Sequence, residues 1–175
     1  KDAGWDQLQQ IRREVTLTPG PVVVRGNVSA RNKKKKKFAD YVLSWEPGIP
    51  IAVVEAKDNK HNVGDGMQQA LEYSEILDIP FVFTSNGDSF VFHDKTIQEG
   101  QIEKEISLEQ FPTPEELRKK YNAYKNLDTL EAVEVAEQEY FTDDGGMSPR
   151  YYQQIAINRT VEAVAKGIDR ILLVM

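Results

Sequence analysis

The sequence contains no cysteine, which excludes disulfide bonds and metal sites built from thiolates. It also lacks any apolar run near the roughly 20 residues that a membrane-spanning helix needs, and it shows no secretory signal pattern. These absences fit a cytoplasmic protein and predict no membrane partner. Because the chain opens on "KDAGW" without an initiator methionine, we expect it to be a fragment of a longer protein.

What the sequence does contain is the composition of a globular domain, with 175 residues, 40% hydrophobic and 29% charged. The net charge of −6 is unevenly distributed. Residues 1–61 hold 12 Lys and Arg against 7 Asp and Glu (net +5), whereas residues 62–175 hold 10 against 21 (net −11). A basic first third is suited to local phosphate binding. A run of five consecutive lysines is either a solvated loop or a contact to a DNA backbone: Lys33, Lys34, Lys35, Lys36 and Lys37.

The pattern of apolar residues predicts an α/β domain over 1–112, a helical connector over 113–147 and the start of a second domain over 148–175. "IAVVEAK" is apolar on both faces and predicts a central strand covered on both sides. In "FPTPEEL", Thr113 is the expected N-cap and Glu116 completes a capping box. The other predicted elements are an irregular or short helical entry (4–20), an extended run (21–31), a strand (38–45), a helix (67–77), a hairpin around "NGD" (81–85 and 89–94), a last helix from Ser148-Pro149 to the C′ residue Gly167, and a strand (170–175).

Glu55 and Lys57 fall on the same face of the predicted central strand, because side chains alternate across a strand. One salt bridge seldom recovers the cost of burying two ions, so a bound cation and a phosphate explain this pair better than a structural ion pair does. Asp40, on the preceding strand, converges with Glu55 if the two strands pair. The two carboxylates and the carbonyl of Ala56 predict a site for Mg²⁺, or Mn²⁺ in its place. Lys57 is predicted to orient or help deprotonate an attacking water.

Gln69 and Tyr73 stand four residues apart, on one face of the predicted helix. A glutamine and a phenol that project together can fix a DNA backbone or orient Lys57. The alternative is that both are ordinary solvent-facing residues of a helix, and the spacing alone does not decide between the two.

Together, "AD" at 39–40, "EAK" at 55–57 and "QALEY" at 69–73 resemble the D…E-x-K core and the Q-x-x-x-Y element of PD-(D/E)xK nucleases. The passage from "FADYVL" to "SFVFHD" is similar to the N-terminal nuclease region of the R (HsdR) subunit of type I restriction–modification enzymes, which joins this nuclease to a DNA-translocating motor. The resemblance implies a restriction-endonuclease-like fold, a mixed central sheet flanked by helices. It implies catalysis by Asp40, Glu55 and Lys57, and DNA positioning by Gln69 and Tyr73.

The last helix resembles the Q-motif of superfamily 2 helicases, because "RYYQQIAI" matches an R-x-Y-Q-x-x-A-I pattern and nominates Gln153 for adenine contact. No G-x-x-x-x-G-K-[S/T] phosphate loop occurs in the sequence. We therefore expect ATP to bind the longer parent protein and not this chain. The sequence departs from the family pattern in having Ala39 in place of the proline before Asp40. It also offers only Glu14, a poor substitute, for the acidic residue that many relatives carry before the first strand.

The leading hypothesis is a Mg²⁺-dependent endonuclease module that cuts double-stranded DNA without reading its sequence. The resemblance implies methyltransferase (M) and specificity (S) subunits as partners. The alternative is a non-catalytic DNA-binding or assembly module that docks the motor to the methyltransferase core. It is disfavoured because an inactive copy has no reason to keep Asp40, Glu55 and Lys57. A hydrolase of small molecules is a third hypothesis, which the basic first third disfavours.

Overall fold

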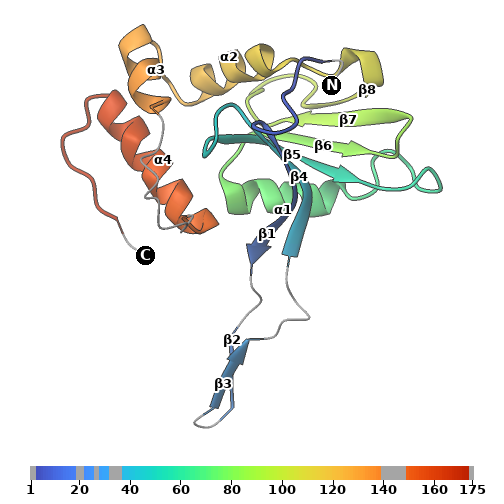
Figure 1. Cartoon of the computed structure of the whole chain (residues 1–175). Helices are drawn as coiled ribbons and strands as arrows, with labels where there is room; N and C mark the ends of the chain where they lie inside the picture. The colour runs from blue at the N-terminus through green and yellow to red at the C-terminus, as the bar shows by residue number, and fades with distance from the viewer. Residues whose placement is uncertain (1–2, 19–21, 26–27, 32–36, 139–148, 174–175) are drawn as a thin grey trace.

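A six-stranded mixed sheet, with helices on both faces, forms the body of the computed structural model (Figure 1). The structure describes residues 3–18, 22–25, 28–31, 37–138 and 149–173. The strands are β1 (Ile11–Thr18), β2 (Val22–Arg25), β3 (Val28–Arg31), β4 (Lys37–Ser44), β5 (Pro50–Ala56), β6 (Phe81–Ser85), β7 (Ser89–Asp94) and β8 (Glu103–Ser107). The helices are α1 (Met67–Leu77), α2 (Pro114–Tyr124), α3 (Leu130–Ala136) and α4 (Tyr151–Ala165), with a 3₁₀ turn, η2 (Leu108–Gln110).

The strand order in the sheet is β1-β4-β5-β6-β7-β8. β5 pairs antiparallel with β4 and parallel with β6, and α1 forms the crossover between β5 and β6. All residues of β5 except Ala56 are buried, as the apolar pattern on both faces of "IAVVEAK" predicted. The predicted α/β class and the mixed central sheet flanked by helices are therefore confirmed.

Each face of the sheet carries its own hydrophobic cluster. α1 contributes Ala70, Tyr73 and Leu77 to the cluster on one face. α2 contributes Leu117 and Tyr121 to the cluster on the other face. Because both clusters enclose β5, the strand that carries Glu55 is held rigidly between two layers of helix.

Several predicted elements are confirmed. The residues "NGD" connect β6 to β7, which pair antiparallel as a hairpin. The Thr113 side chain accepts the backbone N–H of Glu116 (3.2 Å), and Glu116 Oε2 accepts the N–H of Thr113 (2.9 Å), which is the predicted capping box. Gly167 has a positive φ of 72° just past the end of α4, as expected of a C′ residue.

Other predictions were confirmed only in part. The entry expected to be irregular or short helical includes β1, which pairs antiparallel with β4. The extended run is confirmed where it is described: β2 and β3 are both strands, and they pair in a ribbon that stands off the body in Figure 1. β8 was missed because Ile106 is its one buried residue, so it carries little apolar signal. α4 begins at Tyr151 with Arg150 as N-cap, and Ser148 lies outside the described residues. Residues 170–173 form no strand, which agrees with the expectation that the apolar run "RILLVM" is poorly supported as a strand in this chain and pairs with little.

Within the described part of the chain, no helix is long and apolar enough to span a membrane. The division at residues 112 and 147 stays a prediction. The described residues of 149–173 include α4, which bonds to Asp78, the C-cap of α1 in the first segment, and to Tyr121 of α2 in the connector.

Candidate active site

The pairing of β4 with β5 brings the predicted carboxylates to one end of the sheet. Tyr41 lies opposite Val54 in the antiparallel register, so Asp40 falls beside the end of β5. The Oδ2 atom of Asp40 accepts a hydrogen bond from the backbone N–H of Ala56 at 2.8 Å. This bond fixes one oxygen of Asp40 next to Glu55, which is the convergence that the sequence predicted.

Glu55 is the centre of the site. Its side chain is 2% exposed, and its Oε1 atom accepts hydrogen bonds from Lys57 Nζ and from Gln69 Nε2, both at 2.7 Å. Its Oε2 atom is buried and has no hydrogen-bond partner among the described residues. Oε1 is therefore held by two hydrogen-bond donors, whereas Oε2 is buried without one among the described residues.

The charges at the site shift the pKa values of three side chains. Burial raises the pKa of Glu55, and the charge of Asp40 raises it further, while the hydrogen bond from Lys57 opposes both. The hydrogen bond to Glu55 raises the pKa of Lys57, and the negative charge of Asp40 adds to this effect. Burial raises the pKa of Tyr73. A buried carboxylate with a second carboxylate and one ammonium beside it makes a site that a further cation would stabilise.

The donor set at this end of the sheet fits a hard divalent cation. The open Oε2 of Glu55 is a buried oxygen without a partner, and Asp40 adds a second carboxylate. The carbonyl of Ala56 follows directly in the chain. The described residues contain no group of three or more His, Cys, Asp and Glu side chains that could hold a metal. A cation held by the two carboxylates would therefore need backbone, water or phosphate oxygens to complete an octahedral shell.

Gln69 and Tyr73 both lie at this site, where Gln69 donates to the oxygen of Glu55 that also accepts from Lys57. Gln69 Nε2 lies 2.8 Å from Tyr73 Oη as well as 2.7 Å from Glu55 Oε1. Tyr73 is 5% exposed and packs in the hydrophobic cluster beneath α1, so it is not an ordinary solvent-facing residue. The helix thus supplies a donor that holds the Glu55 carboxylate in place.

Gly66, which the sequence analysis did not single out, is required by the geometry of the site. It is the N-cap of α1 with a φ of +95°, and a Cβ added there would lie 3.1 Å from both Glu55 Cγ and Lys57 Cε. A side chain at this position would press on both residues. The signal available in the sequence was a glycine directly before a helix that follows the E-x-K strand.

The loop between Lys57 and Gly66 is fastened to the end of β6. The Lys57 N–H donates to the carbonyl of Ser85 at 2.8 Å, and Thr84 Oγ1, fully buried, donates to the carbonyl of Val63 at 2.6 Å. The parallel strand β6 therefore positions both ends of the segment that brings Gly66 against Glu55.

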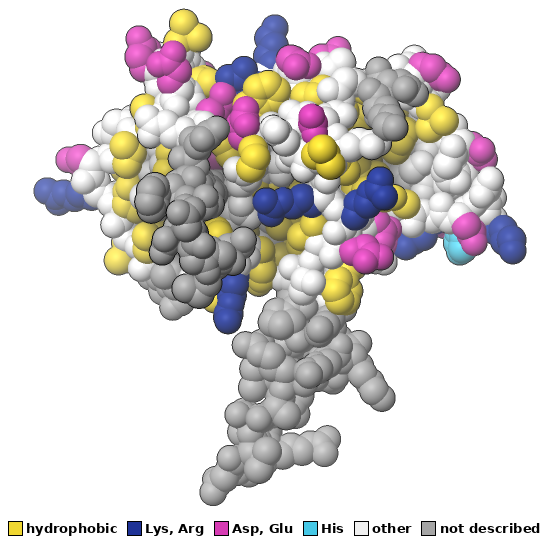
Figure 2. All heavy atoms as spheres, viewed as in Figure 1, with side chains coloured by type: hydrophobic (Ala, Val, Ile, Leu, Met, Phe, Trp, Pro, Cys, Tyr) yellow, Lys and Arg dark blue, Asp and Glu magenta, His cyan; other side chains and the backbone are white. Residues whose placement is uncertain are grey.

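Of the predicted basic run, the structure describes only Lys37. Lys33, Lys34, Lys35 and Lys36 lie outside the described residues, and Lys37 forms an ion pair with Glu72 of α1. Figure 2 shows the Lys and Arg side chains of the described residues scattered singly among Asp and Glu on the face in view. A contact between these lysines and DNA stays a prediction.

The structure places Gln153, the predicted adenine contact, in the first turn of α4. Its side-chain Oε1 accepts the backbone N–H of Arg150 at 2.9 Å and so helps to cap the helix. This capping bond explains a glutamine at this position within the chain itself, and adenine contact in a parent protein stays a prediction.

The fold places the chain in the class of restriction-endonuclease-like α/β proteins, and within that sheet Asp40, Glu55 and Lys57 converge in the order D…E-x-K. Residues 22–101 match the profile of the family described as type I restriction enzyme R protein N terminus. The chain belongs to this family.

Two curated relatives and one solved structure give the scale of the match. The chain is 53% identical over 175 residues to the EcoAI type I restriction enzyme endonuclease subunit of Escherichia coli, covering 99% of the chain and 21% of that protein. It is 28% identical over 188 residues to the EcoKI endonuclease subunit of Escherichia coli strain K12, covering 79% and 15%. A fragment structure described as an HsdR subunit of a type I restriction enzyme from Vibrio vulnificus YJ016 superposes with a TM-score of 0.73 at 39% identity, covering 90% of this chain and 28% of that one. The chain thus spans about a fifth of the length of its EcoAI relative.

Proposed function

We propose that this chain is the Mg²⁺-dependent endonuclease module of a type I restriction enzyme R subunit, which cleaves phosphodiester bonds of double-stranded DNA without sequence specificity of its own. The observation that carries the proposal is Glu55. It is a buried carboxylate with one oxygen held by Lys57 and Gln69 and the other without a partner, beside Asp40. A protein leaves a buried anion half satisfied mainly where a ligand completes it.

In this proposal Asp40, Glu55 and the carbonyl of Ala56 hold the metal. When bound there, Mg²⁺ supplies positive charge that makes a water more acidic and offsets the negative charge of the phosphate. Lys57 presents its ammonium beside Glu55 Oε1, where it can orient the attacking water and stabilise charge that develops on the phosphate oxygens. Gln69 keeps Glu55 in one rotamer by donating to the same oxygen, and Tyr73 keeps Gln69 in place.

For the whole protein we propose the context that the resemblance to type I restriction enzymes implies. In that context the endonuclease subunit works with methyltransferase and specificity subunits on DNA in the cytoplasm, and ATP would bind the longer parent only. Residues 148–175, which include α4, would then be the entry to the motor domain. The non-catalytic assembly module remains the outcome if cleavage is absent.

The test is DNA cleavage by the complete restriction complex that carries this sequence in its R subunit. Asp40→Asn, Glu55→Gln and Lys57→Ala should each abolish cleavage of plasmid DNA while ATP-driven translocation continues. Asp88→Asn, an exposed carboxylate in the turn between β6 and β7, is the matched control and should cleave normally. Wild-type cleavage by a Asp40 or Glu55 variant would reject the assignment, and an intact complex that never cleaves with Mg²⁺ would favour the assembly module.

A second measurement tests the ligands directly. Calorimetric titration of the 175-residue chain with Mn²⁺ should detect a site that disappears in the double variant Asp40→Asn/Glu55→Gln. Equal Mn²⁺ binding by the wild-type chain and the double variant would show that other groups hold the metal.

A further inference from the structure

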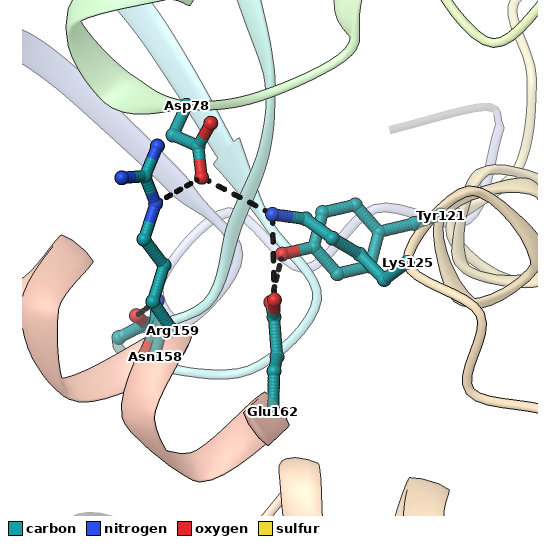
Figure 3. Close-up of polar contacts among 7 residues, drawn as sticks. Asp78, Tyr121, Lys125, Asn158, Arg159 and Glu162 are labelled. Atoms are coloured by element: carbon teal, nitrogen blue, oxygen red, sulfur yellow. Dashed lines mark hydrogen bonds and ion pairs between the residues drawn. The ribbon is translucent and has the colours of Figure 1, made fainter. Parts of the chain in front are cut away.

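Helix α4 packs against α3, and a set of polar contacts, drawn in Figure 3, joins it to α2 and to the C-cap of α1. Among the residues of α4, Tyr151 packs against the hydrophobic cluster beneath α1, and Glu162 is the buried one. Tyr152, Ile157 and Val164 are exposed. An interface that is more polar than a domain core is typical of parts of a chain that move relative to one another.

Four charged side chains alternate in sign across this interface. Arg159 Nε donates to Asp78 Oδ2 at 2.9 Å, and Lys125 Nζ lies 3.2 Å from the same Asp78 oxygen and 3.4 Å from Glu162 Oε2. The Tyr121 hydroxyl donates to Glu162 Oε1 at 3.0 Å. Asn158 Nδ2 adds a bond to the Gly48 carbonyl at 3.0 Å. We call this set the α4 clamp: Gly48, Asp78, Tyr121, Lys125, Asn158, Arg159 and Glu162.

The clamp holds the charged form of Asp78. Burial alone would raise the pKa of this carboxyl, but the hydrogen bonds and charges of Arg159 and Lys125 outweigh burial and lower it. The side chain of Lys125 is 12% exposed and that of Glu162 is 11% exposed, so each of them depends on its partners inside the interface for compensation of its charge.

The clamp acts on the helix that supports the nuclease site. Asp78 is the C-cap of α1 with a φ of +58°, and Gln69, in the first turns of the same helix, donates to Glu55 Oε1. A single 11-residue helix moves as one rigid element, so a shift at Asp78 carries Gln69 with it.

We propose that the α4 clamp is a positioning device for the nuclease site: docked α4 holds α1 where Gln69 meets Glu55, and release of α4 loosens that hydrogen bond and slows cleavage. The proposal rests on the proposed endonuclease function. A partner that binds α4, or a movement that displaces it, would therefore change the position of the Glu55 carboxylate through α1.

The test compares two charge reversals on α4. Arg159→Glu places a carboxylate beside Asp78, whereas Lys166→Glu makes the same change of charge at an exposed residue just past the helix. Arg159 is 62% exposed, so its replacement should leave the fold intact. In the 175-residue chain, Arg159→Glu should raise the amide exchange rates of α4 and α1 and shift the side-chain amide resonance of Gln69. Lys166→Glu should leave both unchanged. Adding Asp78→Asn to Arg159→Glu removes the repulsion and should partly restore exchange protection, since Asn tolerates a positive φ.

Cleavage by the complete complex then separates this proposal from the proposed function. With Arg159→Glu we expect cleavage to slow by about tenfold, with Mn²⁺ affinity unchanged, as for a partial loss of Gln69. If Asp40→Asn abolishes cleavage and Gln69→Ala slows it, but Arg159→Glu cleaves like Lys166→Glu, the clamp is only structural and the proposal fails. If Asp40→Asn cleaves like the wild type, the endonuclease assignment itself fails. An unchanged Gln69 resonance in Arg159→Glu would also overturn the clamp.

Discussion

Gly66 offers the sharpest test of the site's geometry, because two separate costs fall on this residue. A Cβ at Gly66 would lie 3.1 Å from Glu55 Cγ and from Lys57 Cε, closer than ordinary van der Waals contact. The backbone φ of +95° would also be strained for any L-residue, at about 1–2 kcal/mol. Pushing Glu55 and Lys57 off their rotamers adds about 0.5–1.5 kcal/mol. Gly66→Ala should therefore lower the free energy of unfolding by about 1.5–3.5 kcal/mol.

Two other glycines separate the two costs. Gly87, in the turn between β6 and β7, has a φ of +97° but nothing within 4 Å of an added Cβ, so Gly87→Ala should show the backbone cost alone. Gly64, in the same loop as Gly66, has neither a positive φ nor a neighbour within 4 Å, and Gly64→Ala should be close to neutral. Urea denaturation of the three variants of the 175-residue chain measures these differences.

The same three variants predict a difference in activity. Displacing Glu55 by a few tenths of an ångström should slow DNA cleavage by the complete complex at least about tenfold in Gly66→Ala. Gly87→Ala should cleave at the wild-type rate wherever it is folded, despite its lower stability. The reasoning fails if Gly66→Ala loses no more stability than Gly87→Ala and cleaves as fast.

Three further predictions concern side chains of the site and the sheet. Glu55→Gln should abolish cleavage but stabilise the chain at neutral pH by about 1 kcal/mol. It stabilises because it removes a buried charge, one oxygen of which has no partner among the described residues. A lower free energy of unfolding at pH 7, measured by urea denaturation, would contradict this. Alanine at Gln69 or Tyr73 should reduce cleavage strongly with Mn²⁺ affinity nearly unchanged, and loss of metal binding in calorimetry would show that these residues act on the ligands. Burial alone would raise the pKa of Asp94, but bonds from Lys120 (2.6 Å to Oδ2) and Thr96 lower it below 3.8. The stability that the charged Asp94 contributes is thus present above about pH 4 and is lost on acidification. Lys120→Met should therefore make the free energy of unfolding fall less steeply below pH 4. If the variant shows the same dependence of unfolding free energy on pH as the wild type, the Lys120–Asp94 pair contributes nothing.

The local features were predictable because their causes are local. A strand that is apolar on both faces has to lie inside a sheet, and "NGD" between two apolar runs has to turn back on itself. Thr113 and Glu116 cap the helix between them within four residues of sequence. The order D…E-x-K…Q-x-x-x-Y pointed to the site because strand alternation and helix spacing set which of its side chains share a face.

The features that could not be predicted depend on contacts between residues far apart in sequence. β1 is a strand because β4 lies beside it, and the polar residues of "IRREVTLT" give no sequence pattern that predicts this pairing. Helix spacing put Gln69 and Tyr73 on one face, but only the packing of α1 on β5 decided that Gln69 donates to the same oxygen of Glu55 as Lys57 does. The approach of Gly66 to Glu55, and of Arg159 to Asp78 across 81 positions, follows from how the sheet brings elements together. The sequence by itself thus determined which residues are candidates for the chemistry, because residue type and spacing are local. The tertiary structure alone decided which oxygen of Glu55 is held and which is open, because hydrogen-bond partners are set by packing in three dimensions.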